Sequence, residues 1–535
     1  MRKLIALSAL CIGTVSFLSA KISTPSIFGS NMVLQRDHAC PVWGWADPNA
    51  SVTLTFAGKV YTTKADESGE WKIKLTPLSA SSKPRDMVLT EGKANGFNSA
   101  RKNFSRWLKN RPGSLVYENI LVGEVWLCSG QSNMKWSIDR SDDADLETLS
   151  GNHPNLRLIT VPNVGSQEPQ KNFEGSWQEA SLSTVSSFSA VGYLFGKRLH
   201  HILGVPVGLI NNAWGGSACE AWVPRDRLSV NPISQTYLKM WQDKEKTYHY
   251  ETLYKAYEEK LARWKSNQAS GTAQGRPPQK PRNEMTGQHR PANLYNGVLY
   301  PIIGYGIRGA IWYQGESNAG RGYAYRETFP MMIQSWRQAW AQGDFPFYWV
   351  QLADFRNEVT EPGHSEWAEL RESQTLTLDK LRNVGEAVII DAGEGRDIHP
   401  RNKQIVANRL LRHALAKNYG HTVPHQSPRY KSIEVQGRKI ILTFNSVDGS
   451  LYCFDSKTAS GFSICGEDQK FVRAEAKIVG KDKVVVWSES VPSPIAVRYA
   501  WADNPICNLY DKIGAVTLPV TPFRTDDFPV TTTGR

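Results

Sequence analysis

Cysteine is scarce in this sequence. There are 7 cysteines in 535 residues, and one of them, Cys11, lies in the apolar N-terminal stretch. The remaining six are Cys40, Cys128, Cys219, Cys453, Cys465 and Cys507. This number excludes a small disulfide-dense scaffold, and a chain of this length can bury a large core without such support. Cys453 and Cys465 are close enough in sequence to pair, and buried free thiols are an equal alternative.

The chain also lacks a long hydrophobic run. No stretch reaches about 18 uninterrupted apolar residues, so the sequence predicts no membrane-spanning helix. The N-terminus has a different character: Arg2 and Lys3 precede an apolar run at 4–18, and the small residues Ser19 and Ala20 follow. This pattern predicts a signal peptide over residues 1–20 and a secreted or periplasmic protein after its removal. Leu18 is large for its position, so the cleavage site stays open.

Three functional classes find no support in the motifs. No His-Glu-x-x-His or Cys-x-x-Cys pattern occurs, so we expect no metal and no other cofactor. The net charge of +12 is spread along the chain, which argues against a nucleic-acid partner. The Gly-x-Ser-x-Gly turn of α/β-hydrolases such as lipases is absent as well.

The apolar pattern divides the chain into three parts. Residues 21–114 alternate apolar and polar positions, for example at 51–56 and 71–75, which predicts a small antiparallel β-sandwich. Residues 426–535 return to this pattern at 439–444 and 483–487, and predict a second, C-terminal β domain.

The middle part, 115–425, has the character of an α/β domain. Apolar runs typical of strands covered on both faces occur at 120–127, 205–210, 310–313, 347–352 and 387–390. Helical patterns at 191–203 and 325–340 lie between them, as in a parallel sheet with crossover helices. A polar insertion at about 231–290, with a helix expected over 236–266, interrupts this order.

Two glycine turns in the middle part are nearly identical. Ser132 lies in Ser-Gly-Gln-Ser-Asn at 129–133, and Ser317 lies in Gln-Gly-Glu-Ser-Asn at 314–318, each after an apolar strand. Because ligands bind at the carboxyl ends of parallel strands, both serines are candidate nucleophiles, and helix capping is the alternative for either one. A third turn, Trp-Gly-Gly-Ser at 214–217, offers backbone N–H groups suited to an oxyanion.

The segment Asp397-Ile-His399-Pro400 supplies a candidate base. In an extended backbone Asp397 and His399 point to the same side, so the carboxylate can orient the imidazole as in a serine triad. Pro400 suits the first turn of the helix predicted next.

Taken together, these motifs resemble those of the SGNH-type hydrolases, specifically the sialate O-acetylesterase-like group of carbohydrate acetylesterases. The matching segments are 31–36, 123–134, 214–217, 312–318, 397–400 and 498–504, which span most of the chain. The resemblance implies an SGNH-like (flavodoxin-like) parallel-sheet core flanked by the two β domains. It also implies a serine esterase that removes acetyl groups from sugars without a cofactor.

The resemblance assigns roles to individual residues. It implies Ser132 as nucleophile, His399 as base and Asp397 as acid, with Gly216 and the Ser132 backbone as oxyanion donors. The block at 314–318 would complete the oxyanion and binding residues, with Gln314 as the first choice for a third donor, Asn318 in reserve, and Glu316 beside them.

The acid has more than one candidate. Many relatives space the two as Asp-x-x-His, whereas this chain has Asp-x-His, so Asp391, Glu394 or a Ser-His dyad remain alternatives to Asp397.

The expected partner is an acetylated carbohydrate, either sialic acid or a plant or host glycan. A noncatalytic carbohydrate-binding protein and a hydrolase of another ester class are the alternatives. Five of the 18 tryptophans flank the motifs and suit sugar faces, although at least half of all tryptophans should belong to the core. These five are Trp126, Trp136, Trp214, Trp222 and Trp312. The sequence says nothing of oligomeric state.

Overall fold

The computed structural model describes residues 22–92, 113–272 and 274–534. The predicted signal peptide at 1–20 therefore lies outside the described residues. The chain forms two compact units, one containing 41–75 and 85–118 and the other containing 25–40, 76–84 and 119–535. The domain limits at 114 and 425 stay predictions.

The smaller unit is built from antiparallel strands. β2 (Pro41–Trp45) pairs with β5 (Glu70–Lys74). β3 (Ser51–Phe56) lies between β4 (Lys59–Lys64) and the end of β6 (Ser81–Glu91), whose residues 85–91 belong to this unit. In β5 the alternate residues Trp71 and Ile73 are buried and Lys72 is exposed, as expected for a strand with one face on a core. The strands predicted at 51–56 and 71–75 are confirmed.

A parallel sheet forms the centre of the larger unit. Its neighbouring strands are, in order, β10 (Val207–Asn211), β7 (Ser114–Gly130), β11 (Gly309–Tyr313), β12 (Phe347–Val350) and β13 (Val384–Ala387). This is the flavodoxin-like order, and it confirms the predicted α/β class. Two further strands lie beyond β10, the parallel β8 (His153–Thr160) and the antiparallel β9 (Gln178–Ala180). β1 (Val33–Gln35) runs parallel to β7.

The chain order places the functional crevice at β7. From β7 the chain first builds strands on one side, β8 and β10, and then crosses to β11, β12 and β13 on the other. Ligands bind at such a switch point, beyond the carboxyl ends of the strands. Ser132 lies two residues beyond the end of β7.

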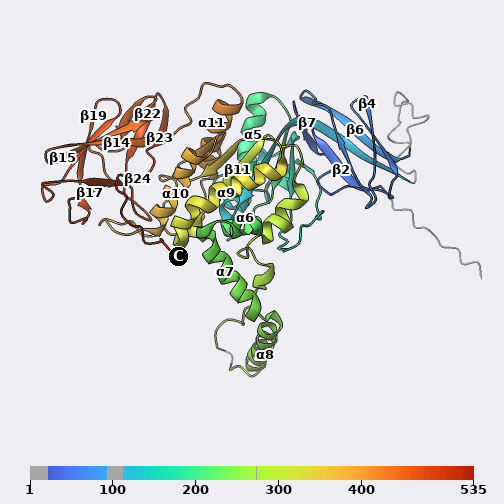
Figure 1. The fold of residues 1–535 in the computed structure, drawn as a ribbon, viewed down its shortest axis with the longest axis horizontal. Helices are drawn as coiled ribbons and strands as arrows, with labels where there is room; N and C mark the ends of the chain where they lie inside the picture. The colour runs from blue at the N-terminus through green and yellow to red at the C-terminus, as the bar shows by residue number, and fades with distance from the viewer. Residues whose placement is uncertain (1–21, 93–112, 273, 535) are drawn as a thin grey trace, which may run out of the picture. The chain divides into compact units, whose positions relative to one another are not determined.

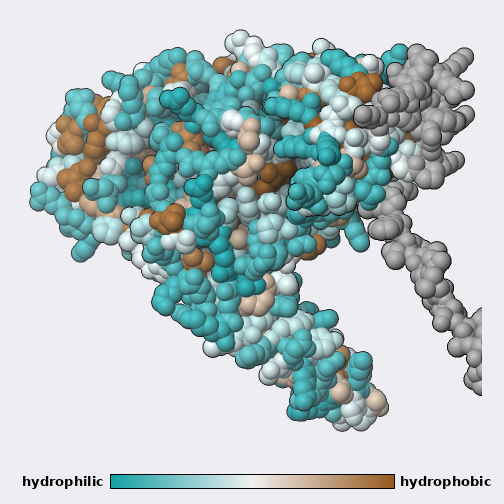
Figure 2. Space-filling view, turned by 45° about the vertical axis from the view of Figure 1, so that its right-hand side comes forward, coloured by the Kyte–Doolittle hydropathy of each residue, from teal (hydrophilic) through white to brown (hydrophobic). Residues whose placement is uncertain are grey.

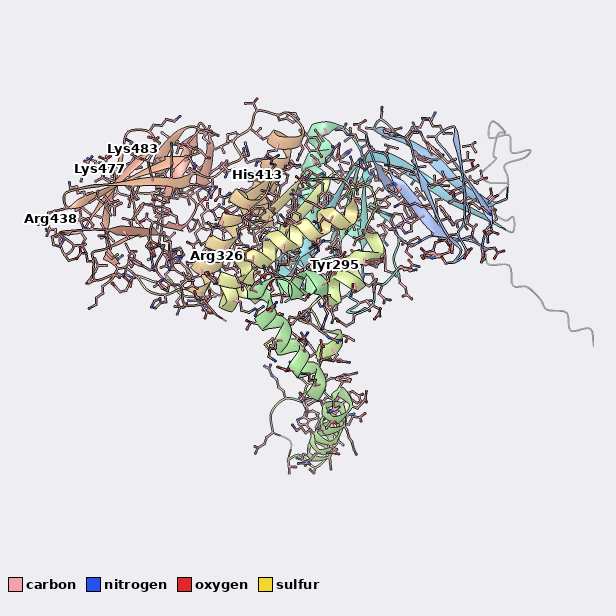
Figure 3. All side chains as sticks on the ribbon, in the orientation of Figure 1. Tyr295, Arg326, His413, Arg438, Lys477 and Lys483 are labelled. Atoms are coloured by element: carbon pink, nitrogen blue, oxygen red, sulfur yellow. The ribbon has the colours of Figure 1, made fainter. Side chains whose placement is uncertain are left out.

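Helices cover both faces of this sheet (Figure 1). α5 (Ala190–Leu203) and α11 (Lys403–Asn418) share one apolar core with strand residues such as Ile311 and Tyr313. α9 (Gly322–Trp340) packs on the opposite side, where Trp312 meets Trp336 with ring centroids 5.6 Å apart. α10 (Glu366–Lys380) lies beside α9. Arg326 belongs to α9 (Figure 3) and forms an ion pair with Glu372 of α10.

The insertion is a pair of helices. α6 (Arg225–Ser229) leads into α7 (Pro232–Thr247) and α8 (Tyr250–Ala269), so the single helix predicted at 236–266 is broken at Tyr248 and His249. In α8, whose residues are all described, no side chain is buried. Figure 1 shows α7 leading away from the sheet to α8, and the surface there is mainly hydrophilic (Figure 2). A helix without a buried face explains why periodicity alone did not fix its limits.

The C-terminal region is a set of antiparallel sheets around one apolar core. In the first sheet the strand order is β14 (Arg429–Gln436), β15 (Lys439–Asn445), β20 (Lys483–Trp487) and β19 (Glu475–Val479). In the second it is β16 (Ser450–Cys453), β22 (Leu509–Ile513) and β23 (Val516–Pro519). In the third it is β18 (Val472–Arg473), β17 (Phe462–Cys465), β21 (Ala496–Tyr499) and β24 (Phe523–Arg524). The strands predicted at 439–444 and 483–487 are confirmed. Cys453 and Cys465 do not pair, since all six cysteines outside the N-terminal stretch are free thiols.

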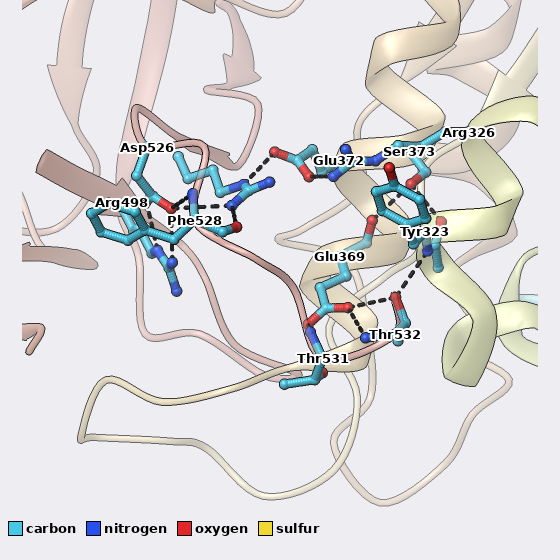
Figure 4. A network of polar contacts seen from close by, with 12 residues as sticks. Tyr323, Arg326, Glu369, Glu372, Ser373, Arg498, Asp526, Phe528, Thr531 and Thr532 are labelled. Atoms are coloured by element: carbon cyan, nitrogen blue, oxygen red, sulfur yellow. Dashed lines mark hydrogen bonds and ion pairs between the residues drawn. The ribbon is translucent and has the colours of Figure 1, made fainter. Parts of the chain in front are cut away.

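Charged hydrogen bonds fix this region to α10. The fully buried Arg371 donates to the backbone carbonyls of Leu352, Ala353, Ala502 and Asp503. Arg524 forms ion pairs with both Glu372 and Asp526. Glu369 accepts hydrogen bonds from Thr531 and Thr532 (Figure 4). A buried guanidinium with several acceptors is held in one geometry, so the C-terminal region and the sheet form one packed body.

No helix in the described part of the chain is long and apolar enough to cross a membrane.

Candidate active site

The backbone around Ser132 makes a sharp turn between two strand ends. β7 ends at Gly130 with φ of 135°, and the short helix α2 (Ser132–Lys135) begins two residues later. A Cβ at Gly130 would lie 2.2 Å from the carbonyl oxygen of Tyr313, so the position excludes any side chain. The next residue, Gln131, donates its N–H to the same oxygen at 2.9 Å. Ser132 is thereby held at the carboxyl edge of β7 and β11.

His399 faces Ser132 from the loop between β13 and α11. Its Nε2 lies 2.8 Å from the hydroxyl oxygen of Ser132, a normal hydrogen-bond distance. On the other side of the ring, Nδ1 lies 3.4 Å from Oδ1 of Asp397, and the backbone N–H of His399 donates to the same oxygen at 2.9 Å. A proton on Nδ1 faces the carboxylate and leaves Nε2 free to accept from the serine hydroxyl.

The other two carboxylates considered for the acid have different partners. Asp391 forms a two-pronged ion pair with Arg409. Glu394 accepts hydrogen bonds from the backbone and side chain of Arg401 at 2.7 and 3.1 Å. Of the three, Asp397 is the one that the structure places beside the imidazole. Its side chain is 53% exposed, so solvent screens its charge more than that of a buried triad acid.

The imidazole is stacked as well as hydrogen-bonded. The ring of Trp136 lies 4.5 Å from that of His399 with an angle of 11° between the planes. Burial lowers the pKa of His399, Asp397 raises it, and the nearby cations Lys403 and Arg140 lower it further, so that the pKa lies below the usual 6.5. At neutral pH the ring is therefore in the neutral form that a base requires.

The two glycines at 215–216 lie beside the serine turn. A Cβ on Gly215 would be 3.5 Å from the Cβ of Ser132, so the two backbones are in close contact. Gly216 has φ of 71°, a left-handed conformation that favours glycine. The N–H of Trp214 donates to the carbonyl of Gly130, which fixes this turn to the end of β7.

Gln314 and Asn318 are buried and support this same turn. The amide nitrogen of Gln314 donates to the carbonyl of Ser217 at 3.0 Å and to Oδ1 of Asn318 at 2.8 Å. The amide nitrogen of Asn318 donates to Glu220 at 2.9 Å, and its oxygen accepts from the N–H of Cys219. A primary amide carries two N–H protons, so Gln314 has none left for a substrate in this arrangement. Their role as a third oxyanion donor stays a prediction.

Ser317, the competing nucleophile, lies in a different environment. Its backbone N–H faces Oε1 of Gln131 at 3.4 Å. The imidazole of His399 lies against the hydroxyl of Ser132, so the structure brings one of the two similar serines to the base.

The tryptophans near the motifs divide into two groups. Trp126, Trp222 and Trp312 are fully buried and belong to the core. Trp136 and Trp214 are partly exposed, and they lie next to the serine and the glycine turn. Only these two of the five can offer a ring to a sugar without unfolding.

Two residues escaped the sequence-based prediction, Asn133 and Lys403. The amide nitrogen of Asn133 donates to Oε1 of Glu316 at 2.6 Å and to the carbonyl of Ile398 at 2.9 Å. Lys403 donates to the amide oxygen of Asn133 at 2.6 Å. Glu316, expected among the binding residues, thus contacts the residue after the serine. The position of Asn133 next to Ser132 was the available signal, whereas nothing local distinguishes Lys403 from a surface lysine.

No group of three or more His, Cys, Asp or Glu side chains suited to a metal ion occurs in the ranges that the structure describes.

Comparison with known proteins places these features in a family. Residues 290–412 match the family described as carbohydrate esterase, sialic acid-specific acetylesterase. The mouse sialate O-acetylesterase is 27% identical over 96% of this chain and 97% of its own length, and the human enzyme is 26% identical over 93% and 91%. The crystal structure of a carbohydrate acetylesterase from Xanthomonas citri is 35% identical, covers 95% of this chain and all of its own, and superimposes with a TM-score of 0.76.

The chain belongs to the sialate O-acetylesterase-like family of carbohydrate esterases. The resemblance drawn from the sequence motifs is therefore confirmed, and the protein is an esterase. Family membership excludes the alternative of a purely noncatalytic binding module. The likeness to the X. citri structure extends over the central sheet and both flanking β regions, since it covers nearly the whole chain.

Proposed function

We propose that this esterase removes O-acetyl groups from sugars by a serine mechanism, with Ser132 as nucleophile, His399 as base and Asp397 as the acid that orients it. The contact of 2.8 Å between the Ser132 hydroxyl and Nε2 of His399 carries the proposal. The position of both groups at the carboxyl ends of the parallel strands supports it.

The reaction proceeds in two acyl transfers. His399 takes the proton of Ser132 as the oxygen attacks the acetyl carbonyl, and the backbone N–H groups of Ser132 and Gly216 stabilise the oxyanion. The imidazolium then gives its proton to the departing sugar oxygen, which leaves an acetyl-serine. Water, activated by the same imidazole, releases acetate and restores the enzyme.

The substrate we propose is an acetylated sialic acid or an acetylated plant or host glycan. The curated relatives named as sialate O-acetylesterases and the X. citri carbohydrate acetylesterase support this class. Trp136 and Trp214 support it physically, since partly exposed aromatic rings pack against the C–H faces of sugars. Export by a signal peptide over 1–20 belongs to the same proposal.

Acetate release from a panel of native substrates tests this function. The panel contains O-acetylated sialic acid and acetylated xylan, xyloglucan and pectin, with p-nitrophenyl acetate as a reference ester. We expect acetate from at least one glycan at a kcat/KM well above that for the reference ester. Hydrolysis of the reference ester alone would contradict a carbohydrate substrate.

The pH dependence of kcat/KM should follow His399. Because the neutral imidazole is the active form and its pKa is lowered below 6.5, activity should rise with pH with a midpoint below 6.5. The measurement is kcat/KM on p-nitrophenyl acetate between pH 4.5 and 8. A midpoint above 6.5 would contradict the environment described for the imidazole.

A further inference from the structure

A lysine lies buried next to the proposed base. Lys403 is completely inaccessible to solvent and begins α11, where the positive end of the helix dipole disfavours a cation. Its ammonium donates to Oδ1 of Asn133 at 2.6 Å and lies 5.3 Å from the ring of Tyr313 and 6.0 Å from that of Trp136. Burying an ammonium costs free energy, so packing alone does not account for a lysine at this position.

Asn133 links this lysine to both parts of the site. It directly follows Ser132, and its amide nitrogen donates to the carbonyl of Ile398, the residue before His399, at 2.9 Å. The second amide proton goes to Glu316, and the amide oxygen accepts from Lys403. With both amide protons and the oxygen engaged, Asn133 is fixed in one orientation and joins the serine turn to the histidine loop.

Glu316 completes the cluster, and only one of its two carboxylate oxygens is hydrogen-bonded to a side chain. Its Oε1 accepts from Asn133, while Oε2 is buried without a hydrogen-bond partner. Burial raises the pKa of Glu316, and nearby backbone groups, Asn133 and Lys403 lower it in part. Asn133 therefore lies between a buried cation and a buried carboxylate.

We propose that Lys403, Asn133 and Glu316 position His399 against Ser132, and that the charge of Lys403 sets how readily His399 takes a proton. The proposal rests on the roles of Ser132 and His399 given above. The three are positioning residues, because they act on the reacting groups through the carbonyl of Ile398 and through the electric field.

The charges around the two groups give the direction of this effect. Lys403 is faced by three carboxylates, Glu316, Glu394 and Asp397. His399 is faced by the carboxylate of Asp397 and by two cations, Lys403 and Arg140. Burial lowers the pKa of Lys403 to about 7, so the lysine is charged in the acid range where His399 titrates. A charged lysine opposes the imidazolium and keeps His399 in its basic form to a lower pH.

Lys403→Met tests this coupling. Removing the cation should raise the pKa of His399. The acid limb of the profile, where kcat/KM rises with pH, should therefore shift upward by roughly half a pH unit. Because Asn133 loses a partner, kcat on p-nitrophenyl acetate should fall about 10-fold with little change in KM. A merely structural lysine would leave the acid limb in place.

Two further variants separate charge, hydrogen bonding and stability. Lys403→Gln keeps a donor and removes the charge, so it should show the same shift with a smaller loss of kcat. Lys417→Met is the matched control, since Lys417 lies on the same helix and donates to the carbonyl of Val384 at 2.6 Å, and it should leave the pH profile unchanged.

Three results would overturn the proposal. The first is an unchanged acid limb in Lys403→Met and Lys403→Gln when both variants are folded. The second is a shift of the acid limb in Lys417→Met that equals the shift in Lys403→Met. The third is a loss of folding in both Lys403 variants while Lys417→Met folds. Activity retained by Ser132→Ala is a separate outcome, which would overturn the proposed mechanism itself.

Discussion

Ser132→Ala should lose essentially all esterase activity while the protein stays folded. Removing the nucleophile of a serine hydrolase lowers kcat by on the order of 10⁶-fold. Only one oxygen atom is lost, so the melting temperature should change little. The measurement is kcat on p-nitrophenyl acetate, together with thermal unfolding of the same preparation.

The matched control is Ser317→Ala in the twin motif. Both serines follow glycine turns at the ends of neighbouring strands, but of the two hydroxyls it is that of Ser132 that lies against His399. Ser317→Ala should keep activity within a few-fold of the unmodified protein. If Ser317→Ala is inactive and Ser132→Ala is active, the nucleophile has been assigned to the wrong motif.

Asp397→Asn should have the second-largest effect. The loss of the carboxylate removes the charge that stabilises the imidazolium, and kcat/KM should fall by on the order of 10²-fold. This is less than the loss of about 10⁴-fold for a buried triad aspartate, because the Asp397 side chain is 53% exposed. Since Asp397 raises the pKa of His399, the acid limb should also shift to lower pH, opposite to the shift expected for Lys403→Met.

Asp391→Asn and Glu394→Gln are the controls for the acid. Asp391→Asn breaks a largely buried ion pair with Arg409 and should lower stability by about 3–5 kcal/mol without moving the acid limb. Glu394→Gln weakens a more exposed pair with Arg401 and should have little effect on either property. If one of these two variants shifts the acid limb as Asp397→Asn is expected to do, that residue is the acid. If none of the three variants matters, the site is a Ser-His dyad.

The central sheet was predictable because both of its faces are covered. The continuous apolar runs at 120–127, 205–210 and 310–313 correspond to parts of β7, β10 and β11. The apolar run at 387–390 overlaps β13 only at its first residue, because β13 spans Val384–Ala387. The run is apolar beyond the end of the strand because Val388 and Ile390 pack in the core of the C-terminal region. β8 escaped notice because its pattern begins with His, Pro and Asn, although its central residues are buried.

The site was predictable where its residues share short motifs with glycine or a helix start. Ser132, the glycines at 215–216 and the pair Asp397 and His399 all lie in such turns. The cluster of Lys403, Asn133 and Glu316 was not, because three separate segments contribute to it. The break between α7 and α8 escaped for a different reason, since α8 has no buried residue and an exposed helix carries little apolar periodicity.

Covalent labelling with a fluorophosphonate is the most direct measurement of the central claim. Trypsin separates the two similar serines, because Ser132 lies in the peptide 110–135 and Ser317 in the peptide 309–321. The account predicts one adduct per chain, located by fragmentation on Ser132, and its loss in His399→Ala. An adduct on Ser317, or labelling of Ser132 that does not depend on His399, would contradict it.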